Sequence, residues 1–261
     1  VATADLSDTY FNDFSNGGGT HYGSSFVTTF NGHADLQLVS DGQPGTHGTW
    51  QAEPFANRTI TSFNASFKFS FNTNGNGGVG DGFSFLFGDM SDMSGDRWAG
   101  GEYGLNAFND MGSGMAVGFD SYGGDSGIHA LWGGTDIAWT NFGTEWWALA
   151  NYSDYNQALD DYWQGTIQIN WDNTSGLQVG ISWPGHPMWW GLETGMFMGI
   201  PTDNFGFGFA ARNGGIDNDV LIDLVDIAYT YILTEEIAGD ANGDGAVDFL
   251  DIVATLSAWG P

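Results

Sequence analysis

The residues with the clearest chemistry form a short acidic run of twelve residues, 240–251. Oxygen-bearing side chains occupy positions 1, 3, 5, 9 and 12 of this run, namely Asp240, Asn242, Asp244, Asp248 and Asp251. Ala246 at position 7 offers its main-chain carbonyl, and Gly245 at position 6 allows the sharp turn that such a loop needs. Calcium is a hard cation that takes six to eight oxygen ligands, so the spacing predicts a calcium loop. The alternative is a solvated acidic turn.

The loop resembles the EF-hand-like repeat of type I dockerin modules, because Asp rather than Glu stands at position 12 and the apolar stretch 249–259 suits a short helix. Dockerins bind cohesin partners through two such repeats, whereas this chain has one, so cohesin is a weaker expectation than calcium. Single repeats of this kind look like the C-terminal repeats of some secreted bacterial proteins. The apolar side of the helix should pack on its own domain or on another molecule.

Composition and charge exclude several classes of partner. The 261 residues are 41% hydrophobic, which is enough for a substantial core, and contain 32 acidic but only 4 basic residues. A formal net charge of −28 repels nucleic acid and anionic membranes, so neither is expected as a partner. The sequence contains no run of eighteen or more apolar residues, so no membrane span is predicted. The absence of cysteine excludes disulfides and thiolate metal sites.

The predicted calcium loop and the first residue of the chain suggest the localisation of the protein. Low-affinity oxygen sites fill where free calcium is high, and a chain beginning at Val1 rather than at methionine suits a processed protein. We therefore expect a secreted, extracellular or cell-surface bacterial protein. Four sequons would permit glycosylation, at Asn57, Asn64, Asn151 and Asn173. In a chain rich in Asn, Ser and Thr, such triplets also arise by chance.

The dominant periodicity is two. From Phe63 to Phe71, aromatic and small apolar residues alternate with polar ones, as in a strand with one buried face. The same alternation returns at 83–87, 167–171, 177–181, 205–209 and 227–231. Gly- and Asn-rich turns separate these segments. The pattern predicts an all-β, two-sheet antiparallel sandwich over residues 1–232, a linker over 233–239, and the calcium loop with its helix over 240–261.

Three segments make the sandwich resemble one family. The segment 80–85 (Gly-Asp-Gly-Phe-Ser-Phe) is similar to the Ala-Asp-Gly-aromatic strand of L-type lectins, and 100–105 (Gly-Gly-Glu-Tyr-Gly-Leu) looks like their Gly-Gly loop. The segment 115–122 (Met-Ala-Val-Gly-Phe-Asp-Ser-Tyr) resembles their metal-binding strand, and 205–215 is similar to a late strand and loop of the wider concanavalin A-like superfamily. The resemblance implies a concanavalin A-like jelly roll that binds glycans.

The resemblance also implies site residues. Asp81 and the backbone at Gly101 would hold sugar hydroxyls, because carboxylates accept paired hydroxyl hydrogen bonds and glycine lets a main chain approach a sugar ring. Asp120, with the carbonyl of Tyr122, would hold a calcium ion that stiffens the sugar site. The alternative for Asp81 is a turn aspartate that caps a strand. A half-buried strand position favours a cation or donor beside Asp120.

Two of the family's metal ligands are missing. Gly118 replaces a glutamate and Gly124 an asparagine, so a manganese site is not expected. Asp125 or water would have to complete the calcium shell. His129 is near in sequence, although a single histidine more often makes an ordinary surface or core hydrogen bond.

Twelve tryptophans could offer stacking surfaces for sugar rings. Trp189 and Trp190 follow the turn 184–187, and we favour these two as contacts for a sugar or protein partner. The alternative is core packing.

The sequence does not favour an enzyme. Glycoside hydrolases need paired carboxylates, and none of the six glutamates lies in the Glu-x-Asp-x-x-Glu pattern of the glucanase branch. The acidic stretches 217–219 and 223–226 are interpreted as turn and strand-edge acids. We expect a non-enzymatic, calcium-stabilised carbohydrate-binding protein. The alternative is a structural subunit that self-assembles through its N-terminal strand, 9–14, and its C-terminal helix.

Overall fold

The computed structural model describes residues 5–30, 32–40, 42–52, 55, 57–72, 81–89, 114–121, 126–142, 165–183, 186–200, 202, 205–215, 219–233 and 249–258. Nine of the predicted site residues lie outside these ranges: Asp240, Asn242, Asp244, Ala246, Asp248, Gly101, Tyr122, Asp125 and Asn151. Predictions that depend on them stay predictions.

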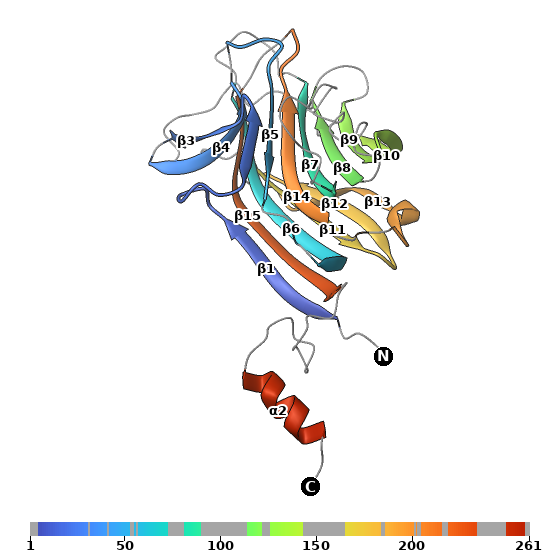
Figure 1. Ribbon diagram of the computed structural model, residues 1–261. Helices are drawn as coiled ribbons and strands as arrows, with labels where there is room; N and C mark the ends of the chain where they lie inside the picture. Colours follow the sequence, from blue (N-terminus) through green and yellow to red (C-terminus); the bar gives the residue numbers. More distant parts are fainter. Residues whose placement is uncertain are drawn as a thin grey trace.

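The described strands form two antiparallel sheets that pack face to face (Figure 1). The eight-stranded sheet runs in the order β13 (Trp189–Thr194), β12 (Gly176–Ser182), β11 (Gly165–Asp172), β6 (Arg58–Asn72), β15 (Asp219–Leu233), β4 (His33–Val39), β3 (Phe26–Phe30), with β1 (Leu6–Asn12) also on β15. The seven-stranded sheet runs β10 (Thr135–Asn141), β9 (Gly127–Trp132), β8 (Gly114–Asp120), β7 (Gly82–Asp89), β14 (Phe205–Arg212), β5 (His47–Gln51), β2 (Thr20–Gly23). The predicted all-β sandwich is confirmed.

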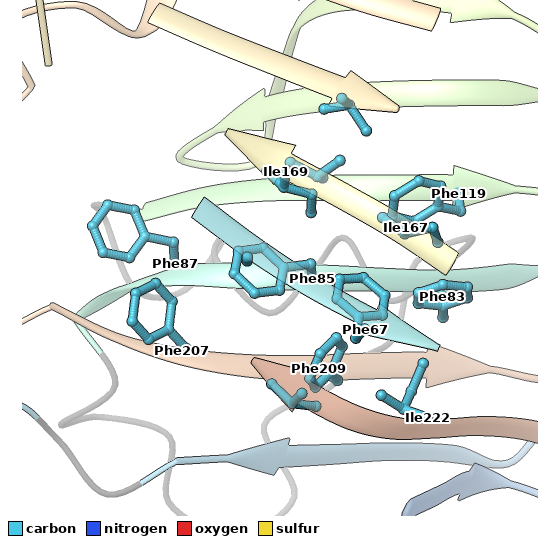
Figure 2. Packing of buried hydrophobic residues seen from close by; sticks show 14 of the residues in the cluster. Phe67, Phe83, Phe85, Phe87, Phe119, Ile167, Ile169, Phe207, Phe209 and Ile222 are labelled. Atoms are coloured by element: carbon cyan, nitrogen blue, oxygen red, sulfur yellow. The ribbon is translucent and has the colours of Figure 1, made fainter. Parts of the chain in front are cut away.

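Phenylalanines from both sheets fill the space between them (Figure 2). Phe63, Phe67 and Phe69 alternate along β6 with polar residues, and all three are buried. The ring of Phe67 stacks on Phe85 of β7 at 6.0 Å between ring centroids. The period-two pattern therefore selects the inward face, because successive side chains of a strand point to opposite sides.

The long strand β15 changes its neighbour partway along its length. Its first half pairs with β4, ending at Ile222 opposite Leu36, and its second half pairs with β1, from Val225 opposite Asn12. On its other side, the register with β6 breaks between Asp223 and Asp226. Leu224, at the break, has a positive φ of 48°. A β-bulge of this kind inserts extra residues and reverses the alternation beyond it.

The N-terminal segment is occupied within its own chain. Residues 9–12 belong to β1 and pair with β15, while Phe14 is buried in the core. This segment therefore already pairs with its own sheet along one edge of β1, and its docking onto a neighbouring molecule stays a prediction. The outward side chain of Phe11 is 60% exposed.

Two short helices are described, η4 (Gly195–Phe197) and α2 (Phe249–Ala258). Neither is long and apolar enough to cross a membrane. In α2, the apolar side chains of Phe249, Leu250, Ile252 and Val253 are exposed. Asp251, the predicted last ligand of the calcium loop, lies within this helix.

Candidate functional site

Strand pairing gathers charged residues at one end of the seven-stranded sheet. Gly82, the first residue of β7, lies opposite Asp120 of β8 on one side and Arg212 of β14 on the other. Asp81 comes directly before Gly82. The structure thus brings the two predicted carboxylates, Asp81 and Asp120, to neighbouring strands at one sheet end.

Asp81 is held by a basic residue and a glycine. Its Oδ2 lies 3.7 Å from the Nε of Arg212, and its side chain is only 11% exposed. At Gly214, a Cβ atom would come within 2.7 Å of both carboxylate oxygens. Only glycine therefore lets this main chain approach so closely. The arrangement leaves a fixed acceptor group at the sheet end, with a positive charge beside it.

The loop that carries Gly214 is itself fixed. The main-chain nitrogen of Asn213 donates to the carbonyl of Thr46 at 2.8 Å, and its Nδ2 donates to the carbonyl of Ser40 at 2.9 Å. Gly45 donates back to the carbonyl of Asn213 at 2.9 Å. Asn213 is fully buried. Its buried bonds hold the contact between Gly214 and Asp81 in place.

Asp120 is fully buried, and the nearby Ser121 and Ser126 are almost so. Of the predicted calcium ligands in the sandwich, Asp120 alone belongs to the described part of the chain. Within that part, no group of three His, Asp or Glu side chains is placed to hold a metal ion. The buried carboxylate suits a cation ligand, but the other predicted ligands are needed to build the site.

His129 contacts an aspartate and a tryptophan of β10. Its Nδ1 lies 2.8 Å from the Oδ2 of Asp136 on β10, and its ring stacks on Trp139 at 5.8 Å. The ordinary hydrogen-bonding interpretation of this histidine fits these contacts.

The two favoured tryptophans differ in exposure. Trp189 is partly buried, packs over Gly191 and lies 6.2 Å from the ring of Phe142. Trp190 is 47% exposed, and its ring covers Gly180 of β12, where a Cβ would meet ring atom Cε3 at 2.8 Å. Trp190 is the more exposed of the two, so it is the better stacking candidate.

A hollow of about 740 Å³ lies elsewhere, over β1, β6, β11 and β15 of the other sheet. The sequon residue Asn64 lines it and is exposed. Of the other sequons, Asn57 is exposed, whereas the Oδ1 of Asn173 accepts a hydrogen bond from the nitrogen of Ile200 at 2.9 Å. This hollow contains none of the predicted sugar ligands.

One interpretation of the acidic stretches is wrong. Asp223 does not lie at a strand edge: it sits within β15, a central strand, and is only 4% exposed. The bulge at Leu224 explains the error, because it breaks the alternation that the sequence pattern assumes.

Sequence reasoning identified Asp81 but missed the residues that hold it. Arg212 and Gly214 both lie in the late segment 205–215, for which the sequence offers a family resemblance but no site residue. A usable signal was present, since Arg212 is one of only four basic residues in the chain.

No protein-family model matches the chain, and no curated protein sequence matches it. Among solved structures, the lectin of Bauhinia forficata in complex with GalNAc aligns with a TM-score of 0.58 at 18% identity, covering 89% of this chain and 100% of that one. Arcelin-5, a lectin-like defence protein of Phaseolus vulgaris, aligns at 0.62 and 15% identity, over 87% and 99%. A seed lectin of Lotus tetragonolobus aligns at 0.61 and 15%, over 88% and 100%. The fold is that of the legume lectins.

Proposed function

We propose that this chain is a non-enzymatic carbohydrate-binding protein and that Asp81 is the central acceptor of its sugar site. The observation that supports this most directly is the placement of the Asp81 carboxylate beside Gly214, where an added Cβ would come within 2.7 Å of both carboxylate oxygens. A fixed, charged acceptor beside an accessible glycine suits paired sugar hydroxyls, because each hydroxyl can donate to a carboxylate oxygen. Solved lectins of the same fold include one in complex with GalNAc.

Arg212 has a supporting part in this proposal. Its guanidinium lies beside Asp81, with the Nε 3.7 Å from Oδ2, and offsets the cost of keeping a carboxylate largely buried. Gly101, from the predicted Gly-Gly loop, and Asp120 complete the proposed sugar site. The exposed face of Trp190 is a second surface on which a sugar could stack.

Calcium belongs to the same proposal. One ion would bind at Asp120, Tyr122 and Asp125 and another in the loop 240–251, and we place the protein outside the cell, where calcium is abundant. The full burial of Asp120 supports the first ion, because carboxylate oxygens are the ligands that calcium prefers and a bound cation offsets the cost of burying a charge.

The test is a glycan array followed by calorimetry on the best ligand. Asp81→Asn keeps the shape of the side chain but removes its charge. Hydrogen bonds to charged groups contribute about 1.5–3 kcal/mol, so affinity should fall by roughly 10- to 100-fold. Asp226→Asn, an exposed carboxylate on the opposite sheet, is the matched control and should bind like the wild type. Calcium chelation should also weaken binding.

Unchanged affinity in Asp81→Asn, with an unchanged circular dichroism spectrum, would contradict the proposed site. Reducing-sugar release from polysaccharides by the wild-type protein would contradict the non-enzymatic assignment.

A second candidate function is a structural subunit that self-associates outside the cell. The observation in its favour is the exposed apolar surface of α2, where Phe249 is 72% and Ile252 is 55% exposed. Exposed apolar surface of this kind often marks an interaction site. Association in solution tests this function.

A further inference from the structure

Two buried aspartates lie side by side on the eight-stranded sheet, away from the proposed sugar site. Asp35 of β4 and Asp223 of β15 are the next positions after the ladder pair Leu36–Ile222. Leu36 and Ile222 point into the core, so alternation directs both aspartates to the opposite face of the sheet. The ladder pair Leu36–Ile222 is the last one between the described parts of these strands, so the two aspartates directly follow it on neighbouring strands, and the charge of Asp223 acts on Asp35. Nevertheless, Asp35 is 0% and Asp223 is 4% exposed.

The carboxylate oxygens of this pair lack donors. Within the described part of the chain, three of the four carboxylate oxygens have no hydrogen-bond partner. They are both oxygens of Asp35 and the Oδ1 of Asp223. Asp223 accepts one hydrogen bond, from the main chain of Leu224. Buried carboxylates without donors are costly, and two like charges on neighbouring strands add to the cost. Burial, with the charge of Asp223, accordingly raises the pKa of Asp35 to about 7.

Nearby side chains do not neutralise the pair. Lys68 stands opposite Asp223 on β6, yet it forms no ion pair with a described residue. His33 lies near both aspartates but is exposed, and Asp13 adds a further negative charge near Asp223. The pair therefore keeps a local excess of negative charge.

The main chain is also interrupted here. Leu224 has no ladder partner in β4, β1 or β6 in the registers of the described strands, and its backbone is left-handed with a φ of 48°. A bulge frees main-chain groups from the ladder and redirects them. Main-chain carbonyls at this break are therefore candidates for further oxygen ligands.

We propose that Asp35 and Asp223 bind a hard divalent cation of the calcium type, which joins β4 to β15 where β15 changes its neighbour. Two carboxylates match the charge of such an ion, and their oxygens are the ligand type that it prefers. The remaining ligands would be main-chain carbonyls at the bulge and water. This site is separate from both calcium sites that the sequence predicts.

A proton is the competing way to relieve the repulsion. A shared proton would link the two carboxylates by a hydrogen bond, but no hydrogen bond joins Asp35 to Asp223. A proton on one residue that is not shared with the other would leave all three of these buried oxygens without a partner in the described part of the chain. A cation can contact several oxygens at once, and for this reason we favour it.

The experiment counts bound calcium in the full chain by equilibrium dialysis after chelator treatment. The wild type should bind one more calcium ion per chain than Asp35→Asn or Asp223→Asn. Asp244→Asn should remove the ion of the loop 240–251 and leave the proposed ion at Asp35 and Asp223 in place. The Asp244→Asn, Asp35→Asn double variant should lose both of these ions. Asp226→Asn, an exposed carboxylate on the same strand, should change nothing.

Thermal unfolding separates the cation from the proton. In chelator, Asp35→Asn should unfold at a higher temperature than the wild type, because the repulsion is gone, and it should lose part of the calcium-induced rise in melting temperature. Unchanged calcium stoichiometry and an unchanged calcium-induced rise in both variants would overturn the proposal in favour of a proton. If neither variant folds, the wild-type protein is crystallised and soaked with terbium: an anomalous peak between Asp35 and Asp223 supports the site, and its absence overturns it.

Discussion

At the scale of single residues, the scarce basic side chains are placed beside carboxylates. Of the three that the structure describes, Arg58 lies 3.2 Å from Asp8 and Arg212 lies 3.7 Å from Asp81, whereas Lys68 stands opposite Asp223 without an ion pair to a described residue. With 32 acidic and only 4 basic residues, most carboxylates cannot be paired in this way. A basic residue beside a carboxylate is therefore a useful marker in this chain, and Arg212 marks the proposed sugar site at Asp81.

Tyr229 gives a pH prediction at this scale. Burial, and to a lesser extent the nearby Asp8, raises the pKa of Tyr229 to about 12 from its ordinary 10.0, although Arg58 acts in the opposite direction. The folded chain thus keeps a proton that the unfolded chain loses between pH 10 and 12. Stability from this group is complete below pH 10 and falls by roughly 2–3 kcal/mol as the pH rises to 12.

Urea unfolding from pH 9 to 12 measures this loss. Tyr229→Phe should be less steeply destabilised by alkali than the wild type, while other tyrosines contribute equally to both proteins. Parallel curves for the two proteins would show that Tyr229 does not titrate abnormally.

At the scale of elements, β6 joins sequence pattern to stability. Phe67 is fully buried, and its ring lies 4.9 Å from Phe209 and 6.0 Å from Phe85 of the facing sheet. Phe67→Ala should lower the free energy of unfolding by about 3–5 kcal/mol, because it removes buried apolar surface and leaves a cavity.

Phe11→Ala on β1 is the matched control, since this side chain is 60% exposed and should contribute less than about 1 kcal/mol. Chemical denaturation of both variants measures the difference. Equal losses would mean that the sheets do not meet at Phe67 as described.

At the scale of the whole molecule, net charge and apolar surface act against each other. A formal charge of −28 opposes self-association, whereas the exposed apolar side chains of α2 favour it. Calcium and salt weaken the repulsion by binding and by screening. If the second candidate function holds, association should therefore need calcium or high ionic strength.

Sedimentation velocity at high protein concentration, with calcium and with chelator, measures this association. Large species should form with calcium and should disappear in a Phe249→Ser, Ile252→Ser double variant. Met196→Ser, at a residue that is 66% exposed on η4, is the control and should still associate. A wild-type chain that stays monomeric with calcium rules out the structural-subunit function.

The sequence by itself determined the sandwich and much of its inward face. Period-two alternation is a local property, so it located β6, β7, β11, β12, β14 and the second half of β15 and identified Phe63, Phe67 and Phe69 as core. The family motifs also singled out Asp81 as a candidate site residue, because that resemblance lies in consecutive residues.

Only the tertiary structure decided what surrounds those residues. Arg212 and Gly214 are more than 130 positions from Asp81, and strand order alone brings β14 beside β7. The pairing of Asp35 with Asp223 depends in the same way on the register of β4 against β15. A bulge at Leu224 then changes the alternation of β15. Contacts between distant strands and a break in register leave no periodic signal in the sequence, and for this physical reason the site's partners had to come from the fold.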